Sequence, residues 1–456
     1  MANAGSMSLP RGRRVSALAV LCALALNSGG VFAADLLQVY RDAKANDAVY
    51  AAARSTVEAG RERLPQGRAL ILPTVNLAGS WVETDADFRS AGPPLGPFIG
   101  REFNSNAWTV TLNQPLFRAQ NWAQYRQAEF QVSQAEATFG QAGQDLIIRA
   151  AQAYFDVLAS QDSLAFIGAQ KAAITEQLES ARRNFEVGTA TITDTHEAQA
   201  RFDLSTSQEI AAQNDLEIKR QGLQQLIGRA PDALTPLRSN LQLVPPQPAV
   251  METWVETAQR ENFTVRVQEA ALEIARREVE RSRAGHYPTL DLVGTVGNAS
   301  TSGSINTGVG SDQKTATLGL QLTVPIFAGF ATSSRVRETL ALAEKVRSDL
   351  ENSRRQSALA ARQSFLGVTN GMAQVRALEQ ALVSSETALA SNKLGYEVGV
   401  RINIDVLNAQ QQVFSTRRDM SRARYDTLMN GLRLKAAAGN LAEPDLEQVN
   451  RLLGGS

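Results

Sequence analysis

Few side chains in this sequence could carry out covalent or metal chemistry. Its 456 residues include only two histidines, His196 and His286, and one cysteine, Cys22. The two histidines lie far apart, and neither has cysteines or carboxylates near it at the spacing of a metal site. The sequence also lacks a glycine-rich phosphate loop. We therefore expect no catalytic residue, no cofactor and no metal, and we predict that the chain is not an enzyme.

The net charge and the N-terminal residues limit which classes of non-enzymatic protein fit this sequence. The 46 basic and 46 acidic side chains cancel, which argues against nucleic acid as a partner. Residues 1–33 combine a basic start, the uncharged stretch Val15–Leu26 and small residues ending at Ala33, the pattern of a cleaved signal peptide. The uncharged stretch is too short to span a bilayer, and Cys22 follows a leucine rather than a small residue, so we expect no lipid anchor. The pattern predicts an exported protein.

Two short segments repeat one pattern of glycine and acid. Phe185-Glu186-Val187-Gly188 matches Tyr396-Glu397-Val398-Gly399 at an offset of 211 residues, and Asp194 matches Asp405 at the same offset. Gly188 and Gly399 follow long helical stretches, where a glycine can end a helix. Asp194 and Asp405 come near the start of the next helix, where a carboxylate favours the helix dipole. Helix capping alone would explain both pairs of residues.

The similarity extends along the chain and indicates a duplicated unit. Pro115-Leu116-Phe117 matches Pro325-Ile326-Phe327 at an offset of 210 residues. Each half is expected to run helix, strand, polar loop, strand, long helix, short turn, helix. A period this long is typical of a duplicated domain rather than a solenoid. We place the first repeat at residues 34–245 and the second at residues 246–456.

Long helices must position the two turns. Residues 119–185 and 332–394 contain no proline and little glycine. A helix of about 65 residues is roughly 100 Å long and needs other helices along its length. Apolar residues recur every three or four positions in narrow seams, as at Ile147, Ala151, Tyr154 and Leu158. Such seams are typical of coiled coils, and the helices alone would also fit a soluble coiled coil.

Four shorter segments alternate apolar and polar residues as strands do. We place these strands at residues 72–84, 105–116, 287–298 and 314–326. In the last of them, Leu318, Leu320 and Leu322 would face lipid and Gln321 the lumen. The pattern fits membrane strands of about ten residues, and it also fits half-buried strands of a soluble sandwich.

The connections between these strands favour the membrane. Residues 85–104 and 299–314 form long polar loops rich in glycine, as expected for exposed connections. Four strands cannot close a barrel, since the smallest membrane barrels have about eight. An open sheet edge would leave its amide groups unpaired in lipid. We therefore expect the chain to oligomerise.

These motifs resemble the TolC family of outer-membrane efflux and secretion proteins over nearly the whole length after the signal peptide. The most specific matches are the two turn motifs, with Ile192-Thr193-Asp194 after the first and Arg401 and Ile404-Asp405-Val406-Leu407 after the second. The resemblance implies a mainly α fold with membrane β-strands, in a homotrimer of the cell outer membrane. Each chain would give four strands to a twelve-stranded β-barrel continuous with a long periplasmic α-helical barrel.

The resemblance also implies a function. The chain would be the outer-membrane exit duct, or channel-tunnel, of a tripartite efflux pump or of a type I protein secretion system. Its partners would be a periplasmic adaptor (membrane fusion protein), an inner-membrane ABC or proton-driven transporter, and outer-membrane lipid. A structural or adhesin-like coiled-coil protein of the envelope is the alternative. The cargo stays open, and the absence of a lipidation cysteine slightly favours the secretion-type branch, which is shared with drug efflux.

Carried over residue by residue, the resemblance places a periplasmic gate at the turns around Gly188 and Gly399. Arg401 and Tyr396 would bond Asp194, within a chain or between chains, and hold the tip shut. Asp405 would belong to an acidic ring in the pore. The family often carries a second acid three residues later, where this chain has Asn408. The ring would then carry three charges rather than six, which weakens the expected cation blockade.

Overall fold

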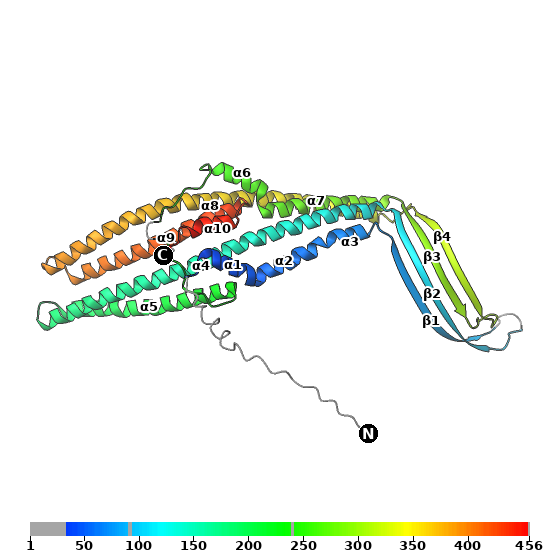
Figure 1. Cartoon of the computed structure of the whole chain (residues 1–456), viewed down its shortest axis with the longest axis horizontal. Coiled ribbons are helices and arrows are strands. Elements are labelled where there is room, and N and C mark those ends of the chain that lie inside the picture. The colour runs from blue at the N-terminus through cyan, green and yellow to red at the C-terminus, as the bar shows by residue number, and fades with distance from the viewer. Residues whose placement is uncertain (1–32, 90–93, 239–240, 455–456) are drawn as a thin grey trace, which may run out of the picture.

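The computed structural model describes residues 33–89, 94–238 and 241–454. The predicted signal peptide, apart from Ala33, lies outside these residues. The molecule is elongated, with a four-stranded sheet at one end and two helical hairpins at the other (Figure 1). The first half contains α1 (Leu36–Asn46), α2 (Ala48–Arg61), α3 (Arg63–Ala69), β1 (Thr74–Phe88), β2 (Ile99–Phe117), α4 (Ala119–Glu186) and α5 (Ile192–Ile227).

The second half contains α6 (Met251–Glu261), α7 (Phe263–Arg283), a 3-10 turn (Ala284–His286), β3 (Thr289–Thr301), β4 (Ser311–Thr323), α8 (Ala331–Glu397), α9 (Asn403–Ala437) and α10 (Glu443–Asn450). Within the described residues, the order of helices, two strands, a long helix and a returning helix thus occurs twice. The predicted boundary between the repeats, at residues 245 and 246, falls in the connection between α5 and α6.

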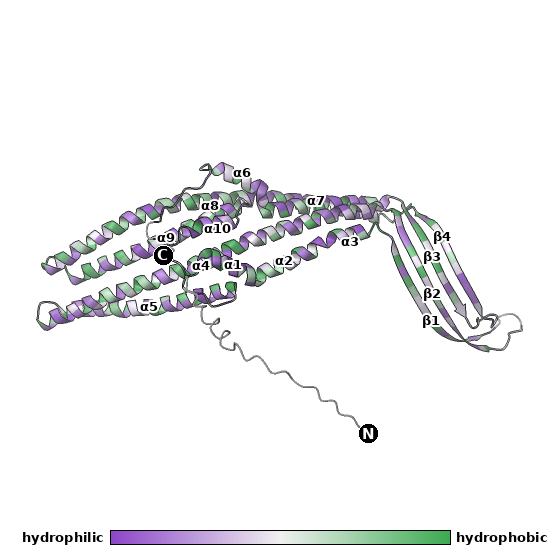
Figure 2. Cartoon of the chain, in the orientation of Figure 1, coloured by the Kyte–Doolittle hydropathy of each residue, from purple (hydrophilic) through white to green (hydrophobic). Residues whose placement is uncertain are grey.

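The sheet is antiparallel, in the order β1-β2-β3-β4, with β1 and β4 at its edges. The register pairs Leu320 with Leu292 and Val75 with Leu112. Because side chains alternate between the two faces of a strand, these apolar residues gather on one face and Gln321 points to the other. Apolar and polar residues therefore alternate along each ribbon (Figure 2).

The strands differ from their predicted ranges mainly at the loop ends. β1 continues to Phe88, β2 begins at Ile99 and β4 begins at Ser311, well inside the segments predicted as loops. Cross-strand pairing there joins polar residues, as between Asp85 and Glu102. Backbone hydrogen bonds do not need an apolar face, so alternation marks only part of each strand.

The long helices match their predicted ranges closely. α4 has 68 residues and α8 has 67, and each returns as a shorter partner, α5 or α9. None of the helices in the described part of the chain is both long enough and apolar enough to cross a bilayer. α8 and α9 approach closely where Gly371 faces Thr427. The space there admits only glycine, since a β-carbon at Gly371 would collide with the threonine hydroxyl.

The helical segment predicted from Asp35 to about Leu70 is divided into α1, α2 and α3. Asp47 has extended backbone dihedrals and caps α2 by accepting from the Tyr50 amide at 2.9 Å. Its carboxylate also binds Arg149 of α4, with a shortest distance of 2.7 Å. The aspartate therefore ends one helix and fixes the next one against α4.

The main apolar core lies midway along the helices, where α1, α4, α5, α9 and α10 meet. Tyr154, Phe155, Leu223, Met429 and Leu446 are among its fully buried side chains. The Tyr154 hydroxyl donates to the Thr235 carbonyl at 2.7 Å, and Leu237 forms a bridge with Leu453. The segments that follow α5 and α10 are thereby tied to this core.

A partly buried ion pair joins the two halves where the sheet meets the helices. Arg118, between β2 and α4, donates through two nitrogens to both carboxylate oxygens of Asp291 on β3, at 2.7 and 2.6 Å. The Asp291 side chain is 7% exposed. Two parallel charge-assisted hydrogen bonds fix both position and angle. The contact therefore fixes the position of the α4 start relative to β3.

Candidate gate at the helical tips

The turns that end α4 and α8 have the same backbone. Gly188 and Gly399 both have φ of 75°, a left-handed conformation that glycine adopts without a steric penalty. In each turn, the amides of the first two residues after the glycine donate to a carbonyl four residues before it. That carbonyl belongs to Asn184 in the first turn and to Gly395 in the second. Differences between the turns must therefore come from their side chains.

In the first turn, Asp194 acts as a helix cap. Thr191 donates to the Asp194 carboxylate from its amide at 3.0 Å and from its hydroxyl at 2.8 Å. In return, the Asp194 amide donates to the Thr191 hydroxyl oxygen at 3.3 Å. This reciprocal pair is a capping box. The carboxylate thus already accepts two hydrogen bonds at the start of α5.

In the second turn, Arg401 lies 3.5 Å from Asp405, four residues later. Arg401 packs over Gly395, where a β-carbon would come within 2.7 Å of the arginine Cγ. The Tyr396 hydroxyl accepts from the Asn184 amide group at 3.3 Å. Tyr396 therefore connects the two hairpins of one chain, but through Asn184.

Within the described residues of a single chain, Asp194 bonds neither Arg401 nor Tyr396. Asp194 is engaged by its own cap, and Arg401, just before the N-cap of α9, has a nearby carboxylate in Asp405 of the first turn of that helix. The contact of Arg401 and Tyr396 with Asp194 between chains stays a prediction, as does the placement of Asp405 in a pore ring. The structure brings Tyr396, Arg401 and Asp405 to one tip, beside the first turn.

A further link at the tip was not foreseen from the sequence. Arg201 of α5 donates to the Gln411 side-chain oxygen at 2.7 Å and to the Asn408 side-chain oxygen at 3.0 Å. Both acceptors lie on α9, so the fork joins the two hairpins. Arg201 follows Asp194 by seven residues, which places both on one face of α5. That spacing is the sequence feature from which a role of Arg201 at the tip could have been predicted.

A small apolar cluster lies behind these polar links. Four of its residues come from the first hairpin and only Leu407 from the second, with Ile174, Leu178, Ala181 and Ala198 as the others. Phe202 and Ile404 pack against it. The second hairpin therefore contributes Leu407 and the partly buried Ile404 to this cluster, and the polar contacts of Arg201 add to the connection.

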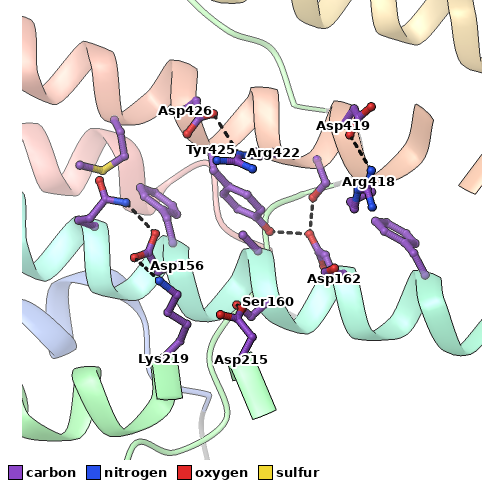
Figure 3. A pocket seen from close by; sticks show the side chains of 17 residues that line it. Asp156, Ser160, Asp162, Asp215, Lys219, Arg418, Asp419, Arg422, Tyr425 and Asp426 are labelled. Atoms are coloured by element: carbon purple, nitrogen blue, oxygen red, sulfur yellow. Dashed lines mark hydrogen bonds and ion pairs between the residues drawn. The ribbon is translucent and has the colours of Figure 1, made fainter. Parts of the chain in front are cut away.

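Nearer the core, the hairpins are separated by a polar cavity of about 500 Å³ between α4, α5 and α9 (Figure 3). The Tyr425 hydroxyl donates to Asp162 at 2.8 Å, and Ser160 donates to Asp215 at 2.7 Å. Burial raises the pKa of Tyr425, and the nearby Asp162 carboxylate raises it further, so the hydroxyl stays protonated as a donor. Polar contacts thus join the two hairpins both at this cavity and at the tip.

The two histidines take no part in this arrangement. His196 lies near the start of α5, and His286 lies at the sheet end of α7; both are exposed. The part of the chain that the structure describes contains no group of histidine, cysteine and acidic side chains that could hold a metal ion.

The fold is that of outer-membrane channels of known structure. The Campylobacter jejuni CmeC outer membrane channel matches with a TM-score of 0.77 and 16% identity, covering 99% of this chain and 98% of that one. The outer membrane protein VceC of Vibrio cholerae matches with a TM-score of 0.73 and 17% identity, covering 89% and 96%.

Sequence comparison identifies the family. The model of the outer membrane efflux protein family matches residues 39–229 and 254–440, one match in each predicted repeat. The alkaline protease secretion protein AprF of Pseudomonas aeruginosa is 34% identical, with 92% of this chain and 87% of the relative covered. The outer membrane protein TolC of Vibrio cholerae is 30% identical, with 96% and 98% covered.

The chain belongs to the outer membrane efflux protein family. It is an outer-membrane exit duct that extends into the periplasm, and it is a passive conduit rather than an enzyme. The predicted family, fold class, function and location are thereby confirmed.

Proposed function

We propose that this chain is the exit duct of a type I protein secretion system, working with a periplasmic adaptor and an inner-membrane ABC transporter. The names of its relatives support a protein cargo. AprF and the proteases secretion protein PrtF of Dickeya chrysanthemi are 34% and 31% identical to this chain over most of its length. The outer membrane efflux protein BepC of Brucella suis is 25% identical over 74% of the chain.

The working form is a homotrimer in outer-membrane lipid. β1 and β4 are edge strands in the single chain, and lipid does not tolerate unpaired edges. Pairing β4 of one copy with β1 of the next in a closed ring of three copies gives twelve strands. Large apolar side chains on both edge strands are more than half exposed, namely Leu77, Trp81, Leu318, Leu320 and Leu322, which suits a lipid-facing surface.

The gate of this duct lies at the two turns. Tyr396, Arg401 and Asp405 already meet at one tip, and Asp194 lies on the facing hairpin. In the trimer, Arg401 bonds Asp194 of a neighbouring copy, and three Asp405 side chains surround the entrance. Exposed ion pairs contribute only about 0–1 kcal/mol each, so a few such contacts bias an opening equilibrium without locking it.

Deletion of the gene in its own host tests the cargo. The culture supernatant of the deletion strain should lose one or more secreted proteins, as measured by quantitative mass spectrometry. Expression of the intact gene should restore them. An unchanged supernatant with increased susceptibility to drugs would replace protein secretion by drug efflux. Loss of surface attachment, with both other measurements unchanged, would favour the adhesin-like alternative.

A further inference from the structure

The starts of α5 and α9 differ by an exchange of two side chains. The first turn leads into its helix with Thr191-Ile192, and the second, at the same offset of 211 residues, with Ile402-Asn403. A polar residue precedes an aliphatic one in the first repeat, and the order is reversed in the second. The backbone hydrogen bonds of the two turns are alike. The two repeats can therefore be compared to see what the swapped side chains do.

In the first repeat, the order suits the helix. Thr191 occupies the N-cap and its hydroxyl accepts from the Asp194 amide. Ile192, the first helical residue, is 46% exposed. The polar side chain therefore satisfies the helix end, and the aliphatic one lies at the surface.

In the second repeat, neither side chain suits its position. Ile402 occupies the N-cap of α9 without any side-chain cap, and it is 61% exposed. Asn403 is only 1% exposed, and neither its oxygen nor its nitrogen has a hydrogen-bond partner within the described residues. A neighbouring copy cannot reach an atom buried inside this chain. An amide buried without partners lowers the stability of the state that contains it.

A second α9 residue adds to this effect. Gln410 lies two turns after Asn403, on the same face of the helix. It is 3% exposed, and its side-chain oxygen has no partner among the residues that the structure describes. The first turns of α9 therefore carry two buried side-chain amides with unsatisfied atoms, Asn403 and Gln410.

Asn403 has a better position available one residue along the helix. Asparagine is among the preferred N-cap residues. If α9 began one residue later, Asn403 would become the N-cap, and its oxygen could accept from the amide of Asp405 or Val406. The side chain would leave its buried position for the helix end. The change would also move Asp405 relative to Arg401, its present partner.

We propose that α9 has two alternative starts and that Asn403 is the residue that allows the tip to change between them. The resting tip uses the Ile402 cap seen here, and the opened tip uses Asn403 as the cap. Asn403 is thus a positioning residue for gate opening, acting through Arg401 and Asp405. This inference rests on the proposed gate, but it concerns a residue outside the predicted gate contacts.

The test copies the first turn into the second. The variant Ile402→Thr/Asn403→Ile gives α9 the capping pair of α5, with Asp405 placed to complete a capping box. In the full-length trimer in detergent, hydrogen–deuterium exchange across residues 402–411 should slow about fivefold, the effect expected of one N-cap. In planar bilayers, the frequency of spontaneous opening should fall by a similar factor.

The converse exchange provides the matched control. Thr191→Ile/Ile192→Asn removes the cap of α5, so exchange across residues 191–200 should become faster while residues 402–411 keep their rate. If the first variant does not assemble, Ile402→Thr alone adds a cap at an exposed position and should slow exchange in the same direction.

Two results would overturn the proposal. One is equal exchange rates at the starts of α5 and α9 in the unmodified trimer, with no change in the variant. The other is slower exchange in the variant with an unaltered opening frequency, because the start of α9 would then be unrelated to the gate. Exchange is measured without cargo or partners, so failure of the secretion proposal would leave that readout unaffected.

Discussion

Arg201 shows how one side chain can change the electrostatics of the tip. Its two guanidinium branches bind amide oxygens of Asn408 and Gln411 rather than carboxylates. The link is charge-assisted, yet no acceptor charge neutralises the arginine. A positive charge therefore lies beside Asn408, which follows Asp405 by one turn of α9, and it should reduce the attraction of cations to the entrance.

Replacement of Arg201 tests this role. Arg201→Gln should raise the opening frequency, because the fork between the hairpins is lost, and should shift permeability toward cations, because a positive charge is lost. Asn408→Asp should lower the opening frequency, since the contact with Arg201 then becomes an ion pair worth about 0–1 kcal/mol. Single-channel recording in planar bilayers at two salt concentrations measures both effects. Identical permeability ratios in Arg201→Gln and the unmodified channel would exclude the electrostatic role.

The gate contacts predicted between chains can be tested in the same recordings. Arg401→Ser combined with Tyr396→Phe should raise single-channel conductance, because both predicted donors to Asp194 of a neighbouring copy are lost. Asp405→Ala should mainly weaken cation preference, since it removes a charge that is predicted to lie in the pore. A trimer that assembles normally but keeps its conductance in the double variant would reduce these residues to local roles within their turn.

The sequence could predict the backbone of the turns but not the partners of their side chains. The positive φ of Gly188 and Gly399 follows from a glycine at the end of a long helix. The bond between Asp194 and Thr191 was foreseeable as a helix cap, yet nothing in the spacing decides between a cap and a contact to another hairpin. Arg401 had two candidate partners, Asp194 and Asp405. Asp405 is only four residues away along the chain and is the one that Arg401 contacts.

At the scale of the strands, the register makes a sharp prediction about the two faces of β4. Leu320→Lys should destabilise the assembled barrel by about 2–4 kcal/mol if the position lies near the bilayer midplane. Gln321→Lys is the matched control and should cost much less, because the next residue points to the lumen. Heat-modifiability of the trimer on gels and the yield of assembled protein measure the difference. Equal losses would show that the predicted faces are wrong.

The bounds of helices and strands were predicted well where a sequence pattern ran along the whole element, and less well where the element continued beyond the pattern. The long helices α4 and α8 lack proline over their whole length, and their bounds agree with the predicted ranges within a few residues. The strands extend into polar sequence because main-chain pairing has no preference for apolar side chains. The division of the first helical segment depends on Asp47 and its distant partner Arg149, a contact that local sequence does not encode.

At the scale of the whole molecule, the sheet predicts that the chain oligomerises, and the family predicts the number of copies. Mass measurement in mild detergent should give a trimer, because four strands with two free edges require further copies to close and three copies give the twelve-stranded barrel expected of the family. Unfolding of the strands and loss of the trimer should occur together, as followed by circular dichroism and by gel mobility. A stable folded monomer with a complete barrel would contradict the prediction.

The two free edges of the sheet also bear on inheritance. A chain that can fold its helices but carries a defective edge strand would still be able to join two intact copies through its other edge. If a cell made equal amounts of intact and defective chains, and these mixed at random, only about one ring in eight would consist of intact chains alone. Mutations in β1 or β4 should therefore act dominantly over a normal gene copy, whereas mutations that abolish folding of the whole chain should be recessive.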